Sequence, residues 1–139
     1  MAKRKKILIT EDVNVFLELE ESIFQREGID IIIAGSGTQA LEVIEDERPD
    51  LVILDLNMED IGGDECFLQI KENPQLKATP VLIMSHANWG EDVERARRAK
   101  CDEVIMKPIN RQHLLKTVRE LLLLADRTAG RVDTTLPLP

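Results

Sequence analysis

The sequence is poor in aromatic residues, which make up 3 % of its 139 residues, with no tyrosine and one tryptophan. Proteins that bind single-stranded nucleic acid stack bases on aromatic side chains, so this composition gives that function little support. Basic residues are also outnumbered, because 18 Lys and Arg face 26 Asp and Glu for a net charge of −8. Such a surface repels phosphate backbones, and we expect no direct nucleic-acid binding by this domain.

Long apolar runs and paired cysteines are missing as well. No run approaches the roughly 20 residues of a membrane-spanning helix. The N-terminal MAKRKKILIT has an apolar part too short for the core of a signal peptide. The two cysteines, Cys66 and Cys101, lie far apart in no metal or redox motif. We therefore expect reduced thiols, a cytoplasmic location and no membrane segment.

What the sequence does contain is a regular alternation of short apolar runs and longer amphipathic segments. Apolar residues make up 43 % of the chain, enough for the core of one domain. The patterns predict strands near 6–10, 29–34, 51–54, 81–84 and 104–106, and helices near 13–27, 36–48, 63–72, 88–100 and 109–125. This alternation is typical of a parallel sheet covered on both faces. We predict an α/β fold, a doubly wound five-stranded parallel sheet. Of the two common strand orders of such sheets, we expect the flavodoxin-like order 2-1-3-4-5.

Local patterns predict details of three helices. Helical spacing places Phe16, Leu19 and Ile23 on the inner face of the first helix. Ser36 and Gln39 form a capping-box pattern at the start of the second. The inner face of the last helix is predicted to consist of Leu114, Leu115, Val118, Leu121 and Leu122.

The domain is expected to span residues 4–125. The remaining segment, 126–139, reads DRTAGRVDTTLPLP, is rich in helix breakers and has no helical period. It is interpreted as a tail or linker, which could lead to a further domain outside this chain.

Chemically active side chains follow the ends of the predicted strands. Glu11 and Asp12 follow the first strand, Asp55 the third, Ser85 the fourth and Lys107 the fifth. In an open α/β sheet, ligands bind beyond the carboxyl ends of the strands, where the strand order reverses. The sequence therefore predicts that these five residues converge at one edge of the sheet.

Three carboxylates at one edge need positive charge nearby, because like charges at close range cannot all remain ionised. Lys107 supplies one charge, and a hard dication such as Mg²⁺, which prefers oxygen ligands, supplies more. An aspartate carboxylate beside Mg²⁺ and a lysine can attack phosphorus and form an aspartyl phosphate. Asp55 is interpreted as this nucleophile, tolerated at the end of a buried strand because it faces solvent and has cations nearby.

Each of these residues also has a simpler explanation. Asp55 could be an ordinary acid at a strand end, and Glu11 and Asp12 could merely cap the first helix. Lys107 could belong to a simple strand stop, and Ser85 alone would be uninformative. The presence of all five, each closing a predicted strand, favours the functional interpretation.

Four segments carry a resemblance to a known family: ILITED, LVILDLNMEDIGG, PVLIMSH and MKPIN. In this order they resemble the response regulator receiver domain of two-component signalling, the CheY-like family, over roughly residues 4–125. The resemblance implies that Asp55 is the phosphoacceptor and that Mg²⁺ is bound by Glu11, Asp12, Asp55 and the backbone carbonyl of Asn57. It also implies that Ser85 is the switch hydroxyl and that Lys107 pairs with the phosphate.

The resemblance further implies a phosphorelay function. A sensor histidine kinase or a phosphotransfer protein would donate the phosphoryl group. Phosphorylation would then alter the surface formed by the fourth helix, fifth strand and fifth helix, which a downstream protein or a fused output domain reads, with homodimerisation possible. Such a domain is a switch rather than an enzyme, catalysing at most its own phosphorylation and dephosphorylation. The closing RVDTTLPLP also resembles the lead-in to a PilZ-type cyclic-di-GMP-binding domain.

Three positions depart from the family pattern. Glu59 replaces the usual proline, which predicts a more acidic and less rigid loop. His86 replaces a small residue, and Val104 replaces the aromatic residue that usually couples to the hydroxyl. These departures leave open a phosphate-independent pseudo-receiver that acts as a scaffold for protein interactions. A flavin-binding protein or an aspartate-dependent phosphatase fits less well, because the acidic pair would repel a flavin phosphate and Asn57 replaces the phosphatase's second acid.

Overall fold

The alternation of apolar runs in the sequence produces an alternation of strands and helices in space. The structure is a computed structural model and describes residues 4–11, 14–58, 60–85, 94–95, 98, 103–106 and 109–128. Its strands are β1 (Lys6–Thr10), β2 (Asp30–Ala34), β3 (Leu51–Asp55), β4 (Val81–Ser85) and β5 (Glu103–Met106). Its labelled helices are α1 (Asn14–Arg26), α2 (Gly37–Glu47), α3 (Gly63–Glu72) and α5 (Arg111–Thr128).

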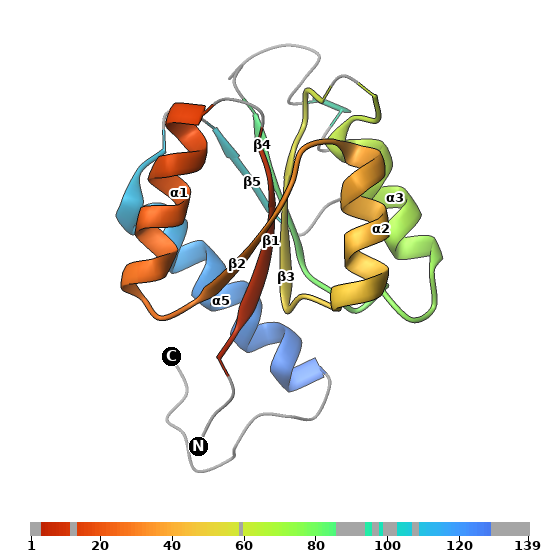
Figure 1. Cartoon of the computed structure of the whole chain (residues 1–139). Coiled ribbons are helices and arrows are strands. Elements are labelled where there is room, and N and C mark those ends of the chain that lie inside the picture. The colour runs from red at the N-terminus through yellow and green to blue at the C-terminus, as the bar shows by residue number, and fades with distance from the viewer. Residues whose placement is uncertain are drawn as a thin grey trace.

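The strands form one parallel sheet in the order β2-β1-β3-β4-β5, which confirms the predicted fold class and strand order. Successive side chains of a strand point to opposite faces, so each strand supplies two cores. Ile7, Ile9 and Ile53 belong to the cluster that also contains buried residues of α1 and α5. The strand side chains that point to the other face, such as Leu8 and Val52, form a second cluster with buried residues of α2 and α3. Figure 1 shows α1 and α5 on one face and α2 and α3 on the other.

The inner face of α1 differs from the prediction. Leu19 is 41 % exposed, so its assignment to the inner face is wrong, and Phe16 is only partly buried. Ile23 is buried as predicted, and Glu20 and Phe24 are buried with it. These three share one side of the helix because residues three and four positions apart are neighbours. The face was misassigned because a glutamate occupies one of its inward positions.

The predicted inner face of α5 is confirmed, since all five of its apolar residues are buried. The helix runs to Thr128, three residues beyond its predicted end. Near this end, Asp126 accepts hydrogen bonds from Lys5 Nζ at 3.0 and 3.1 Å, which joins the helix to the segment before β1. Of the predicted fourth helix, Glu94, Arg95 and Arg98 are helical, and its other residues and the tail from 129 lie outside the described residues.

The capping box at α2 is confirmed in part. Ser36 Oγ accepts a hydrogen bond from the N–H of Gln39 at 3.1 Å. The return bond goes one residue further back than expected, because Gln39 Oε1 accepts from the N–H of Gly35 at 2.6 Å. The first bond satisfies a backbone donor that the helix start leaves without an intrahelical acceptor, and the second ties the preceding residue to the first turn.

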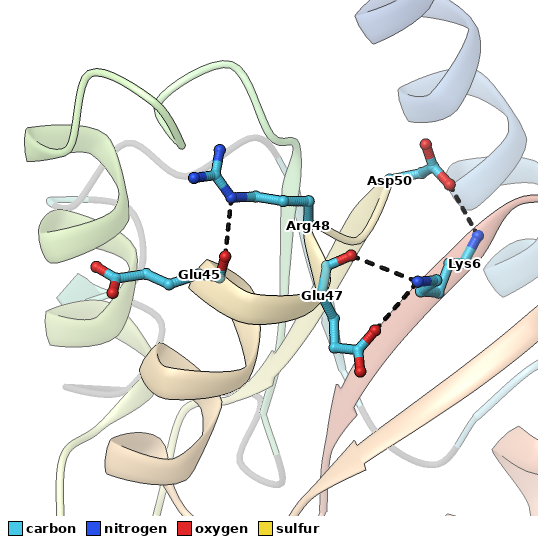
Figure 2. Close-up of polar contacts among 5 residues, drawn as sticks. All are labelled: Lys6, Glu45, Glu47, Arg48 and Asp50. Atoms are coloured by element: carbon cyan, nitrogen blue, oxygen red, sulfur yellow. Dashed lines mark hydrogen bonds and ion pairs between the residues drawn. The ribbon is translucent and has the colours of Figure 1, made fainter.

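Polar contacts at the amino end of the sheet stabilise the register of β1 against β3 (Figure 2). The N–H of Lys6 donates to Asp50 Oδ2 at 2.8 Å, and the N–H of Asp50 donates to the carbonyl of Lys6 at 2.7 Å. Lys6 Nζ also donates to Glu47 Oε2 at 3.2 Å. Arg48, with a left-handed φ of 48°, ends α2 and turns the chain into β3. These contacts decide which residues meet at the opposite end of the two strands.

Within the described part of the chain, no helix combines the length and apolar character needed to cross a membrane.

Candidate functional site

Asp55 is the last residue of the central strand of the sheet. It is only 2 % exposed, so the expectation of a solvent-facing residue is wrong. Its carboxylate is supported by the following loop, because Oδ1 accepts a hydrogen bond from the N–H of Asn57 at 2.9 Å. A charge-assisted hydrogen bond of this kind replaces part of the hydration that burial removes.

Glu11 reaches the same level of the sheet as Asp55. The register pairs Ile9 of β1 with Ile53 of β3, and each acid lies two residues further along its strand direction. Glu11 is also buried, at 5 % exposure. The structure thus brings two predicted site carboxylates to the carboxyl edge of neighbouring strands, at the position where the strand order reverses.

Ser85 lies on the other side of Asp55. Asp55 pairs with Met84 of β4, and Ser85 is the next residue and the last of that strand. Ser85 is fully buried. The described part of the predicted site therefore comes from the ends of three adjacent strands.

The remaining predicted site residues, Asp12 and Lys107, lie outside the described residues, as do Glu59 and His86. Their convergence on Asp55 stays a prediction. Among the residues that the structure describes, no group of three or more His, Cys, Asp or Glu side chains is arranged to hold a metal ion. The predicted set has three carboxylates, and the described residues supply only two of them.

The donors at this edge fit a hard dication. Two buried carboxylates, Glu11 and Asp55, lie at one level of the sheet, and the backbone carbonyl of Asn57 follows two residues later. All are oxygen donors, which Mg²⁺ prefers, and burying two like charges together favours a bound cation.

Gly63 brings α3 unusually close to Asp55, a role that the sequence analysis did not identify. The N–H of Gly63 donates to the carbonyl of Leu56 at 3.2 Å. A Cβ atom at Gly63 would lie 2.7 Å from the carbonyl oxygen of Asp55, a contact that real structures do not show. The sequence feature that could have indicated this role is the Gly62-Gly63 pair shortly after Asp55, since glycine often marks a close approach of two backbone segments.

Asp60 anchors the loop after β3 to the start of α2. Its Oδ1 accepts from the N–H of Gly37 at 3.0 Å, and its Oδ2 accepts from the N–H of Thr38 at 2.9 Å. The hydroxyl and N–H of Thr38, together with the N–H groups of Ile61 and Gly37, hold the pKa of Asp60 well below its usual value. This anchor restrains the loop that carries Asn57, and no local sequence pattern predicts it.

The lowered pKa of Asp60 predicts a pH-dependent contribution to stability. A carboxyl group whose pKa is lower in the folded state stabilises the fold above its unfolded value, here 3.8, and loses this effect as pH falls through the folded value. Asp60→Ala should therefore lower the melting temperature at pH 7, and the difference from wild type should shrink below pH 3.8. Asp60→Asn, which keeps one acceptor oxygen, serves as the control, and its melting temperature at pH 7 should fall less than that of Asp60→Ala. If the difference in melting temperature between wild type and Asp60→Ala grew on acidification, the stabilising role of ionised Asp60 would be contradicted.

Cys66 is excluded as a nucleophile. It is buried and free, its Sγ donates to the carbonyl of Gly37 at 3.7 Å, and burial raises its pKa to about 12. The thiol is protonated at neutral pH and unreactive.

Arg95 joins the predicted fourth helix to the start of α3. Its Nη2 donates to Asp64 Oδ1 at 2.9 Å and its Nε to Asp64 Oδ2 at 3.2 Å. This bidentate ion pair lies beside Gly62, close to the loop that follows Asp55. It is a further contact that the sequence analysis missed, because the two residues are distant in the chain.

Comparisons with known proteins agree with this fold. A sequence profile of the response regulator receiver domain matches residues 7–119. The polar-differentiation response regulator DivK of Brucella anthropi is 27 % identical over 118 residues, covering 85 % of this chain and 96 % of that protein. The receiver domain of a signal transduction histidine kinase from Syntrophus aciditrophicus superposes with a TM-score of 0.82 at 27 % identity, covering 96 % of this chain and 98 % of that one. The chain belongs to the response regulator receiver domain family of two-component signalling.

A more distant structure shares the fold. The receiver domain of a sensor histidine kinase from Pseudomonas aeruginosa has a TM-score of 0.81 at 20 % identity, covering 86 % of this chain and 98 % of that one. That structure has a magnesium ion coordinated in its active site cleft. At this identity the comparison supports the fold alone, and the magnesium is a property of that protein.

Proposed function

We propose that this domain is a phosphorylation-controlled switch in which Asp55 accepts a phosphoryl group from a sensor histidine kinase or a phosphotransfer protein. The observation that carries the proposal is the pair of buried carboxylates, Asp55 and Glu11, at one level of neighbouring strands. Burying carboxylates at one edge of the sheet costs free energy, which a bound cation would offset. The membership of the receiver family supports the same function.

The proposed reaction is a phosphoryl transfer between two side chains. A carboxylate oxygen of Asp55 attacks the phosphorus of a phosphohistidine, an O–P bond forms, the P–N bond breaks, and the imidazole leaves with a proton from solvent. Glu11, Asp12, Asp55 and the carbonyl of Asn57 would hold Mg²⁺, which neutralises charge on the phosphoryl oxygens when bound. The N–H of Asn57 orients the Asp55 carboxylate before the reaction.

Ser85 and Lys107 are proposed to receive the phosphoryl group after transfer. Ser85 ends the strand next to that of Asp55, so we propose that its hydroxyl donates to a phosphoryl oxygen from that side. Lys107 would pair with another oxygen as a point charge. These new contacts are proposed to shift the surface of the fourth helix, β5 and α5, which a downstream partner or a fused output domain would read.

The free, buried Cys66 thiol supports a reducing compartment, and we place this function in the cytoplasm. Direct nucleic-acid binding is not part of the proposal, because the net charge is −8.

A phosphate-independent pseudo-receiver is the second candidate. Its support is Val104, which is partly buried against the core cluster on the α2 and α3 face and offers no aromatic ring for coupling to Ser85. This difference concerns how a signal leaves the site and does not affect the donors around Asp55. The scaffold therefore predicts an intact fold that takes up no phosphate.

Phosphate uptake should depend on magnesium and on Glu11. Incubation with acetyl phosphate and Mg²⁺ is expected to add one phosphoryl group, seen by intact-mass spectrometry, and chelation with EDTA should reduce the gain to background. Glu11→Gln keeps the size of the side chain but loses a charged ligand, so it should raise the Mg²⁺ concentration for half-maximal uptake by at least about tenfold.

The matched control for this experiment is Glu18→Gln, an exposed position on α1. It carries the same substitution away from the site and should behave as wild type. Uptake that proceeds equally well in EDTA would count against a magnesium site, and no uptake by the folded wild-type protein would favour the scaffold.

A further inference from the structure

Thr10 makes a side-chain contact with the backbone of the proposed phosphoacceptor. Its hydroxyl oxygen accepts a hydrogen bond from the N–H of Asp55 at 2.9 Å and lies 3.4 Å from the carbonyl of Ile53, to which it donates. Thr10 is 2 % exposed, so these bonds are shielded from water. One hydroxyl thus links the end of β1 to two residues at the end of β3.

This hydroxyl occupies the place where a backbone acceptor would continue the sheet. The paired residues of β1 and β3 end at Ile9 and Ile53. Directly after β3, the N–H of Leu56 points to β4, where it donates to the carbonyl of Met84 at 2.9 Å. The N–H of the preceding residue, Asp55, therefore points to β1, and Thr10 Oγ1 accepts it there.

We propose that Thr10 is a positioning residue for phosphoryl transfer to Asp55. Thr10 directly precedes Glu11, so a single hydrogen bond fixes the nucleophile's backbone relative to the first residue of the proposed magnesium-binding pair. Transfer requires the attacking oxygen to be held within a fraction of an ångström of the productive position. The proposal rests on the proposed function, since it concerns the rate of that same reaction.

An aliphatic residue at position 10 would preserve the packing and lose the bond. Thr10→Val is nearly isosteric, but it leaves a buried N–H of Asp55 facing two methyl groups. The end of β3 would then move to find water or another acceptor, and the Asp55 carboxylate would move with it. Thr10→Ser keeps the hydroxyl and should keep the position.

The test measures the rate of phosphoryl uptake from acetyl phosphate at saturating Mg²⁺ for the wild type, Thr10→Val and Thr10→Ser. We expect Thr10→Val to be slower by on the order of tenfold and Thr10→Ser to stay within about twofold of wild type. Ile44→Val, which removes one methyl group from the buried core under α2, is the control for destabilisation alone and should react at the wild-type rate. Amide hydrogen exchange at Asp55, measured by NMR, should accelerate in Thr10→Val only.

Each other outcome has a definite meaning. A wild-type rate for Thr10→Val, equal slowing in Thr10→Ser, or equal slowing in Ile44→Val would overturn the positioning role. No phosphate uptake by the wild-type protein would contradict the proposed function itself and any role of Thr10 in it. Exchange at Asp55 would still report whether Thr10 holds the strand end, so the two failures are distinguishable.

Discussion

Asp55→Asn is expected to reduce phosphoryl uptake from acetyl phosphate to background. The substitution replaces the attacking carboxylate oxygen with an amide, which is a poor nucleophile and carries no charge for a metal ion. It should leave the fold intact, because the amide oxygen can still accept the hydrogen bond that the N–H of Asn57 donates at 2.9 Å. The measurement is the intact mass after incubation with donor and Mg²⁺.

The fold of this variant should be at least as stable as that of the wild type. Replacing a buried carboxylate with a neutral amide removes the cost of burying that charge. Asp46→Asn, an exposed position on α2, is the matched control and should take up phosphate normally. A mass gain that survives in folded Asp55→Asn would assign the acceptor to another residue.

Gly63→Ala is expected to destabilise the domain and slow phosphorylation together. The new Cβ would lie 2.7 Å from the carbonyl oxygen and 3.1 Å from the carbonyl carbon of Asp55. Both are backbone atoms, which cannot rotate away as a side chain can. Overpacking of this kind costs about 1–3 kcal/mol, whereas the better helix propensity of alanine returns at most about 1 kcal/mol.

The melting temperature of Gly63→Ala should fall by on the order of 5 °C, and the uptake rate should fall because Asp55 is displaced. Gly35→Ala is the control, since its Cβ would meet only the flexible end of Gln39 at 3.4 Å. Differential scanning calorimetry and the phosphate uptake assay would measure the two effects. A Gly63→Ala protein as stable and as reactive as Gly35→Ala would show that the close approach has no importance.

The fold was predictable because its main signals are local. Each strand is a short continuous apolar run, and alternate residues such as Leu8 and Ile9 feed the two faces of the sheet. The rules for alternating strands and helices reduced the strand order to two common forms, one of which is the observed 2-1-3-4-5. The error at Leu19 arose where the pattern is mixed, because α1 buries Glu20 and exposes two apolar residues, Val15 and Leu19.

The candidate site was predictable only as a set of strand ends. The positions of Glu11, Asp55 and Ser85 follow from where their strands stop, which the sequence marks by the change from apolar to polar residues. The burial of Asp55 could not be foreseen, because it depends on how the following loop and α3 pack over it. The contacts of Thr10 and Asp60 also join segments distant in sequence, and no local pattern shows which polar side chain will meet which backbone group.

The proposed function depends most on which residue carries the phosphoryl group. An acyl phosphate is reduced by borohydride to an alcohol, so an aspartyl phosphate is trapped as homoserine, which peptide mass spectrometry can locate. After incubation of the wild-type protein with acetyl phosphate and Mg²⁺, we predict homoserine at position 55 and at no other acid. Homoserine at Asp50 or Asp60, or no trapped residue in a protein that is folded, would contradict the central claim.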